Sequence, residues 1–293
     1  MINRRNFFFI LFILFILFLA TACAQGKNAD NFSGDQAYQY LQTLLDFGPR
    51  IPGNTGRENA AAYIKTTLEE NAWSVTLQDF QFDETPLQNI IAKKGNGDTL
   101  IIVGTHYDTR AVSDQDSDVE KQDDPVPGAN DGGSGTAVLL ELSRVLEVPE
   151  NIELWLVFFD AEDQGNLNGW NWSIGADYFV HQLQERPSKT LIIDMIGDED
   201  LNIYQEKNST PSLVTEIWKV VEDLKYQSFL IPQFKYAMMD DHLPFLNAGY
   251  STALLIDFDY PYWHTTADTI DHVSSRSLQI VGDVLVQWLS EQN

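Results

Sequence analysis

The chain has 293 residues, of which 44% are hydrophobic and 12% aromatic. This composition excludes a disordered acidic tail and predicts one or two ordinary domains with a packed core. The sequence has 18 Lys and Arg residues and 43 Asp and Glu residues, so the formal net charge is −25. So acidic a surface repels a phosphate backbone, which excludes nucleic acid as an expected partner.

Residues 1–22 predict a secretory signal peptide. Two arginines near the start precede an unbroken apolar run from Phe7 to Ala20, and two small residues follow that run. The run is shorter than the roughly 20 apolar residues that cross a bilayer, so a permanent membrane helix is the weaker interpretation.

Cys23 is the only cysteine and directly follows the predicted cleavage site. The segment from Leu19 to Cys23 resembles a bacterial lipobox, which implies a lipid-modified Cys23 and a lipid-anchored tether over residues 23–34. We therefore expect an exported bacterial lipoprotein, anchored to a membrane and facing the periplasm or the cell surface. The alternative is a secreted protein with a chance cysteine. Without a partner for an internal disulfide, the fold must be stabilised by core packing or metal.

The first predicted elements of the mature chain are helical. Apolar residues at three- and four-residue steps predict helices over 35–45, with Asp35 as N-cap, and over 56–71. Alternating apolar and polar residues over 73–82 predict a half-buried strand, and residues 89–93 and 99–104 are expected to form a hairpin.

Strands and helices then alternate along the chain. The predicted strands span 152–159, 191–196 and 252–258, and the predicted helices span 135–146, 211–224 and 278–289. This alternation predicts a single α/β domain over residues 35–293, with a mixed, largely parallel central sheet flanked by helices. The polar, acidic stretch 111–127 is typical of a loop that lies over a surface or a site.

Polar side chains follow four of the apolar runs, at the place where open α/β sheets bind ligands. Together with a glycine-rich bend before a predicted helix, they supply His106, Asp108, Asp131, Glu162, Asp163, Asp194 and His264. Any one of these residues could be a buried histidine, a helix cap or part of a solvated loop. Two imidazoles and several carboxylates together form a ligand set that suits zinc better than calcium.

Six ordered strings resemble the family of zinc-dependent aminopeptidases that also contains the animal-type and bacterial glutaminyl cyclases. They are His106-Tyr107-Asp108, Gly128-Ala129-Asn130-Asp131-Gly132, Phe158-Phe159-Asp160-Ala161-Glu162-Asp163, Asp194-Met195-Ile196-Gly197, Asp240-Asp241-His242-Leu243-Pro244-Phe245 and Trp263-His264-Thr265. The resemblance implies a zinc aminopeptidase-like fold. One departure is Glu162-Asp163, where many members of the family have two glutamates.

In the cyclase branch, the resemblance implies one zinc ion per chain on Asp131, Asp163 and His264. It also implies catalytic roles for Glu162, which transfers the proton, and for Asp194 and Asp240, which hydrogen-bond to it. Asp241 is the alternative to Asp240. Trp263 and Tyr260 would wall the substrate pocket, and His106 and Asp108 would support the site or hold a second metal.

In the peptidase branch, the resemblance implies two zinc ions bridged by Asp131. Asp163 and His264 would then bind one ion, and His106 and Asp194 the other, with Glu162 as general base.

Two features favour the cyclase branch, namely the string that begins at Asp240 and the tryptophan directly before His264, where peptidases more often have tyrosine. They predict a glutaminyl-peptide cyclotransferase that converts the N-terminal glutamine of peptides or proteins to pyroglutamate and releases ammonia. A two-zinc aminopeptidase is the alternative, and a non-catalytic peptide-binding lipoprotein is the third possibility. The peptide substrates and the oligomeric state are left open.

Overall fold

A six-stranded sheet lies at the centre of the computed structural model, which describes residues 31–292. Its order is β1-β2-β4-β3-β5-β8. The strands are β1 (Ser74–Phe82), β2 (Thr85–Gly95), β3 (Thr99–His106), β4 (Ile152–Phe159), β5 (Lys189–Asp194) and β8 (Thr252–Ile256). β3, β4, β5 and β8 are parallel to one another, and β1 and β2 are antiparallel to their neighbours. The predicted α/β fold with a mixed, largely parallel sheet is confirmed.

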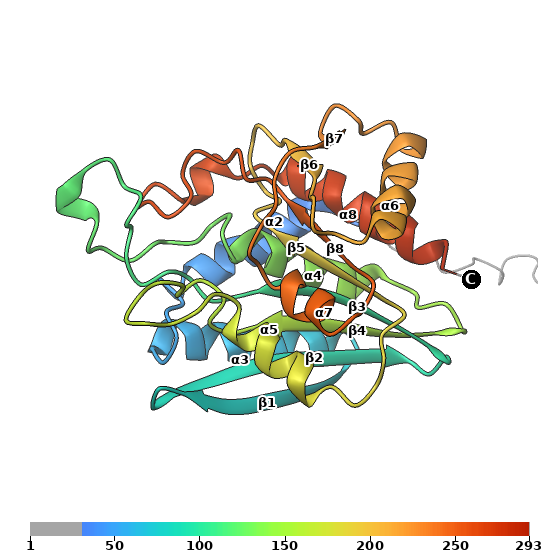
Figure 1. Cartoon of the computed structure of the whole chain (residues 1–293), viewed down its shortest axis with the longest axis horizontal. Helices are drawn as coiled ribbons and strands as arrows, with labels where there is room; N and C mark the ends of the chain where they lie inside the picture. The colour runs from blue at the N-terminus through green and yellow to red at the C-terminus, as the bar shows by residue number, and fades with distance from the viewer. Residues whose placement is uncertain (1–30, 293) are drawn as a thin grey trace, which may run out of the picture. The chain divides into compact units, whose positions relative to one another are not determined.

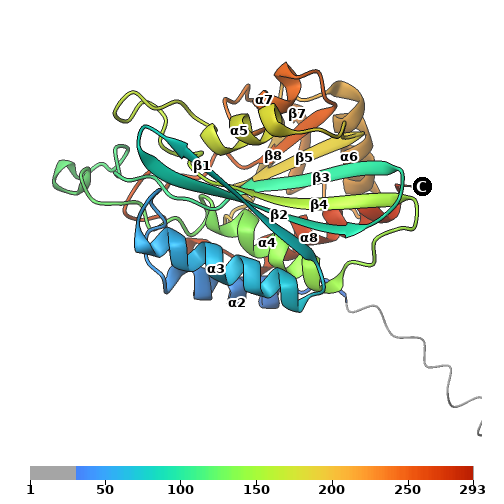
Figure 2. The same cartoon turned by 90° about the horizontal axis from the view of Figure 1, so that it is seen from below.

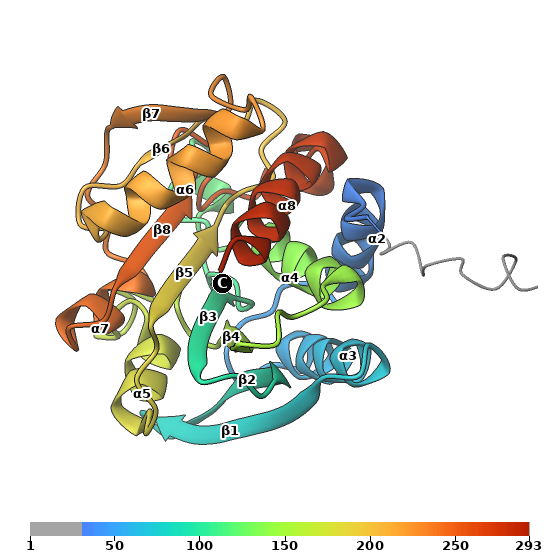
Figure 3. The same ribbon diagram turned by 90° about the vertical axis from the view of Figure 1, so that its right-hand side faces the viewer.

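Helices cover both faces of this sheet (Figures 1 and 3). One face carries α2 (Gly34–Leu45), α3 (Thr55–Glu70), α4 (Gly133–Val145), α6 (Pro211–Asp223) and α8 (Ser275–Ser290), and the other carries α5 (Ile174–Gln182) and α7 (His242–Asn247). A small parallel pair, β6 (Ile203–Gln205) and β7 (Leu230–Phe234), lies apart from the main sheet. Within residues 31–292, short 3-10 helices span Val119–Lys121 and Ile270–His272.

The covered faces explain why the central strands are almost wholly apolar. In β4, Leu154, Leu156 and Phe158 join the larger core under α2, α4 and α8. The alternate residues Trp155, Val157 and Phe159 join a second core with α5 and α7. Because successive side chains of a strand point to opposite faces, a strand covered on both sides has no place for polar alternation.

The predicted hairpin of residues 89–93 with 99–104 is wrong. β2 pairs with β1 and β4, and β3 pairs with β4 and β5, so β4 lies between the two segments. The tight hairpin is instead β1–β2, where Asp83 and Glu84 both have positive φ, as a primed two-residue turn requires. β1 and β2 run obliquely to the parallel strands (Figure 2), in keeping with the twist of the sheet.

The start of the described chain is packed onto the helices. α2 begins at Gly34, and the Ser33 side chain caps it by accepting a hydrogen bond from the Gln36 N–H, so Asp35 lies in the first turn and is not the N-cap. The Phe32 ring fills the space in front of Gly282, where an added Cβ would lie 2.1 Å from the ring. The predicted signal peptide and Cys23 lie outside the described residues. Among residues 31–292, no helix has the length and apolar character needed to cross a membrane.

Candidate metal centre and active site

The residues predicted to form a site meet at the carboxyl edge of the parallel strands. His106 is the last residue of β3 and Asp194 the last residue of β5. Asp131 lies just before α4, and Glu162 follows β4 by a short turn. The sheet topology therefore unites side chains that are far apart in the sequence.

Asp131 belongs to two groups of possible metal ligands. In the first group, His106 Nε2 lies 3.1 Å from Asp131 Oδ1 and 3.0 Å from Asp194 Oδ1. In the second, His264 Nε2 lies 2.7 Å from Asp163 Oδ1 and 3.6 Å from Asp131 Oδ2. All five residues are buried.

The donor set fits zinc. Imidazole nitrogens and carboxylate oxygens are its usual ligands besides cysteine, and the possible ligand atoms of each group all lie within 4.8 Å of one another. The buried atoms Asp131 Oδ2 and Asp163 Oδ2 accept no hydrogen bond. Buried carboxylate oxygens without a partner are costly, and a bound cation would remove that cost.

Left-handed backbone positions aim these side chains. Ala161, Met195 and His264 have φ values of 57°, 45° and 55°. Ala161 precedes Glu162, Met195 follows Asp194, and His264 is itself a site residue. Non-glycine residues adopt this conformation at a cost that the surrounding packing must offset. Gly132 also has positive φ, and an added Cβ there would lie 2.4 Å from the Asp108 carbonyl oxygen, so only glycine fits before α4.

Asp108 fixes the backbone of the two acidic residues that follow β4. Its Oδ1 accepts a hydrogen bond from Glu162 N at 3.0 Å, and its Oδ2 accepts one from Asp163 N at 3.3 Å. Asp108 Oδ1 also lies 3.4 Å from His106 Nδ1. Asp108 thus touches members of the site without belonging to either group of possible ligands.

The neighbours that hold His264 were not predicted from the sequence, except for Trp263. Asp114, from the acidic loop 111–127, lies 3.5 Å from His264 Nδ1, and Arg110 binds the Asp114 carboxylate through two hydrogen bonds. A carboxylate behind a metal-binding imidazole fixes its tautomer and orientation. The rings of Trp172 and Trp263 stack near the imidazole, with centroids 5.8 and 3.8 Å away. The loop that was expected to lie over a site therefore contacts one.

A site cavity of about 390 Å³ opens over these groups. The predicted site residues that line it are Asp131, Glu162, Asp163, Asp194, Asp240 and Trp263, and the residues not predicted include Trp172, Met239 and Phe258. Asp241 is buried beside Asp240 and does not line the cavity.

Tyr260 does not line the site cavity. It is buried, and its hydroxyl donates a hydrogen bond to Asp268 Oδ1 at 2.7 Å. The Asp268 carboxylate in turn accepts hydrogen bonds from the backbone N–H groups of Asn130 and Asp131. Tyr260 was expected to form a wall of the substrate pocket. The structure instead places it behind the loop that carries Asp131.

Burial and crowding set the protonation of the acids. Burial, together with the nearby charges of Asp240, Asp241 and Asp163, raises the pKa of Glu162 well above its usual range. Burial and the charges of Asp194 and Asp241 likewise raise the pKa of Asp240. The Ser173 hydroxyl lies 3.3 Å from Glu162 Oε1 and donates a hydrogen bond to it.

Most of the unpredicted residues carry no sequence signal of their own. Asp114 is one of several acids in a polar loop, and Trp172 lies in a segment without periodicity. Only the packing of the loops against His264 distinguishes them.

Known proteins resemble this chain over most of its length. Aminopeptidase YwaD of Bacillus subtilis is 30% identical over 282 residues, which cover 87% of this chain and 56% of that protein. The chain thus spans just over half the length of this relative. Glutaminyl-peptide cyclotransferase of Drosophila melanogaster is 26% identical over 275 residues, which cover 80% of this chain and 75% of that protein.

Solved structures also share the fold. Glutaminyl cyclase of Porphyromonas gingivalis superposes with a TM-score of 0.85 at 28% identity, over 90% of this chain and all of that one. The model of Peptidase family M28 matches residues 89–289, which include every possible metal ligand named above. The chain therefore belongs to peptidase family M28, within the superfamily of zinc aminopeptidase-like enzymes.

Proposed function

We propose that this enzyme is a glutaminyl-peptide cyclotransferase, which closes an N-terminal glutamine to pyroglutamate and releases ammonia. The observation that carries the proposal is that Glu162, Asp194 and Asp240 line one cavity beside the Asp131, Asp163 and His264 group. Cyclisation moves protons between an amine and a leaving amide nitrogen, and several carboxylates around one small cavity suit that task.

The residues Asp131, Asp163 and His264 would hold one zinc ion, with a further position open to substrate. When bound there, zinc would polarise the side-chain amide carbonyl of the substrate. His106 and Asp108 then serve as supports, because Asp108 contacts both His106 and the backbone of Glu162.

Glu162 acts as the proton carrier. The α-amine of the substrate attacks the side-chain amide carbon, so a new C–N bond forms and the amine loses a proton to the Glu162 carboxylate. Glu162 returns that proton to the amide nitrogen, and the old C–N bond breaks as ammonia leaves. No water is consumed. Asp194 and Asp240 hold the amine and the leaving nitrogen by hydrogen bonds, and Trp263 and Trp172 limit access of water to the cavity.

The similar proteins support both this reaction and a second candidate. Glutaminyl cyclases are found among the curated relatives and the solved structures, and the Bacillus relative is an aminopeptidase. The second candidate is a two-zinc aminopeptidase. It is favoured by one observation, that His106, Asp131 and Asp194 form a second complete group of possible ligands.

Mass spectrometry of two peptides tests the proposal. The purified zinc-loaded domain is incubated with a Gln-initiated peptide and with a Leu-initiated peptide of otherwise identical sequence. Loss of one ammonia from the first, with the second unchanged, is the expected result. Release of the first residue from either peptide would establish the aminopeptidase instead.

Metal content provides the independent measurement. About one zinc per chain is expected of the cyclase and about two of the aminopeptidase. The variant Glu162→Gln should keep the metal and lose turnover.

We also propose that Cys23 carries a lipid after removal of residues 1–22, and that this anchors the enzyme to a bacterial membrane on its periplasmic or outer side. Labelling of the wild-type protein by a radioactive fatty acid, and loss of the label in Cys23→Ser, is the expected outcome. An unlabelled wild-type protein in the culture medium would contradict the anchor.

A further inference from the structure

A second cavity of about 570 Å³ adjoins the site cavity. The two share Trp172, Met239 and Asp240 as lining residues, so they lie side by side. We call the second cavity the aromatic groove. Its volume lies within the range of ligand-binding pockets.

Aromatic side chains from two elements form the groove. Phe80 and Phe82 come from the edge strand β1 and Tyr178 comes from α5, and the Phe80 and Tyr178 rings are stacked with centroids 4.3 Å apart. Phe80, Phe82 and Tyr178 are all only half-buried. Large, half-exposed aromatic rings that face a common cavity are typical of a ligand-binding surface.

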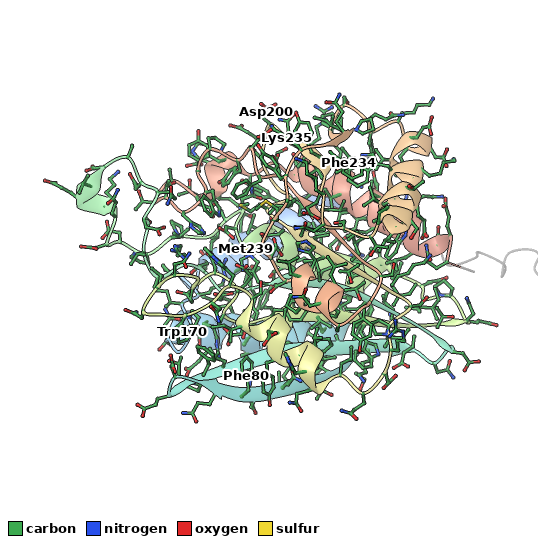
Figure 4. The ribbon with its side chains drawn as sticks, viewed as in Figure 1. Phe80, Trp170, Asp200, Phe234, Lys235 and Met239 are labelled. Carbon is green, nitrogen blue, oxygen red and sulfur yellow. The ribbon has the colours of Figure 1, made fainter. Side chains whose placement is uncertain are left out.

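Met239 lies at the junction of the two cavities and is 66% exposed. In the view of Figure 4, Met239 lies above Phe80, and Phe234 lies to its upper right. A methionine this exposed is unusual in a folded protein, and its flexible side chain adapts to different apolar partners. A ligand long enough to reach from one cavity into the other would contact this side chain.

The groove offers no strong cation to an acidic ligand. Asp177 lines it with His181, whose Nδ1 lies 3.5 Å from Asp177 Oδ2, and among the described residues that line it there is no lysine or arginine. The whole chain carries a net charge of −25, which also repels anions. Three amide side chains, Gln81, Asn171 and Asn247, offer hydrogen bonds to a peptide backbone.

We propose that the aromatic groove binds the second and third residues of the substrate, and that the enzyme acts on peptides or protein N-termini with apolar or aromatic, non-acidic residues there. This inference rests on the proposed function, because it requires that the substrate's first residue occupies the site cavity. Free glutamine and glutamine followed by acidic residues are poor substrates. The groove supplies binding energy at a distance from the reacting amide, and such remote contacts raise kcat/KM.

Three amidated tripeptides test the groove, namely Gln-Phe-Phe, Gln-Gly-Gly and Gln-Glu-Glu. The expected kcat/KM falls in that order, with the first at least about tenfold above the second, since aromatic surface is buried only for the first. Phe80→Ala and Tyr178→Ala should each bring the ratio of kcat/KM for Gln-Phe-Phe to that for Gln-Gly-Gly toward one. Phe234→Ala is the matched control, because Phe234 is 55% exposed and lines neither cavity. It should leave the ratio unchanged.

Equal kcat/KM for Gln-Phe-Phe and Gln-Gly-Gly in the wild type, or a preserved ratio in both groove variants, would overturn the groove while leaving the cyclase intact. Fluorescence anisotropy of a Gln-Phe-Phe peptide with a C-terminal label measures binding to the groove independently of the proposed reaction. If no pyroglutamate forms from any peptide but binding is weakened by Phe80→Ala and not by Phe234→Ala, the groove stands and the proposed reaction is wrong.

Discussion

Glu206 joins the loop that carries Asp240 to the body of the domain. Its Oε1 accepts hydrogen bonds from the N–H groups of Asn208 and Met238, both at 3.0 Å. Its Oε2 accepts hydrogen bonds from the N–H and the hydroxyl of Ser209, at 2.7 and 2.8 Å, and lies 3.4 Å from His242 Nε2. The residue is 1% exposed. Met238 and His242 flank Asp240, so this one carboxylate fixes both ends of the segment over the site.

The size of the effect follows from the pKa of Glu206. Burial raises that pKa, but the adjacent His242 ring and the hydrogen bonds from the N–H groups of Asn208 and Met238 outweigh burial and lower the pKa from 4.5 to about 2. The lowered pKa corresponds to about 3 kcal/mol of stabilisation of the folded state, at about 1.36 kcal/mol for each pKa unit. We therefore expect Glu206→Gln to lower the free energy of unfolding by about 3 kcal/mol at neutral pH. Since unfolding entropy is about 2.1 cal/mol/K per residue, the melting temperature should fall by about 6 °C.

The sign of the pH dependence is fixed by the same shift. Because the folded-state pKa is depressed, the stabilisation is complete above pH 4.5 and is lost as the pH falls toward 2. Calorimetry of wild type and Glu206→Gln at neutral pH and at about pH 3.5 should thus show a difference that narrows in acid. Glu185→Gln, at an exposed position, is the control and should melt with the wild type. A fall of less than about 2 °C at neutral pH, or the same fall at both pH values, would refute the reasoning.

Three further predictions concern the site and its support. Glu162→Gln should lower kcat by about 10²–10⁴ with unchanged zinc content, measured by steady-state kinetics and elemental analysis; retained turnover would remove Glu162 from proton transfer. Asp114→Ala should weaken zinc binding by about 10–100-fold in competition with a chromophoric chelator, since Asp114 lies 3.5 Å from Nδ1 of His264; unchanged affinity would show that this contact is not needed. Arg57→Leu breaks a buried ion pair of 2.6 Å with Asp160 and should destabilise the fold by about 3–5 kcal/mol at pH 8 by urea unfolding. Burial raises the pKa of Asp160 to about 7 despite Arg57. Below that pH the folded protein carries Asp160 in its neutral form, which needs no partner, so the loss of stability caused by Arg57→Leu should shrink in acid. A loss of stability that is the same at all pH values would contradict this.

Strands covered on both faces were predictable from the sequence. The predicted strand 152–159 has the bounds of β4, because an apolar run interrupted only by Glu153 is buried most readily as a strand between two helical layers. Helices with strong periodicity, such as α6 and α8, were also predicted to within a few residues. The six-residue α7 was not, because a helix so short carries no periodicity of its own.

Strand pairing was decided by the tertiary structure. The glycines at 95 and 97 resembled a hairpin turn, yet β4 lies between β2 and β3. Local turn propensity carries no information about β4, which begins more than 45 residues after the end of β3. β4 pairs with both β2 and β3, and all of its side chains except Glu153 are apolar.

The sequence by itself determined which residue types gather at the carboxyl edge of the sheet, because strand ends and their polar successors are local features. It predicted His106, Asp131, Asp163, Asp194 and His264, which the fold brings together in two groups that share Asp131. Only the tertiary structure decided what stands behind and beside them. It placed Tyr260 on Asp268 instead of in the cavity, brought Asp114 to His264, and set the aromatic groove beside the site. The physical reason is that these contacts are made between loops, whose positions depend on the packing of distant elements and leave no period in the sequence.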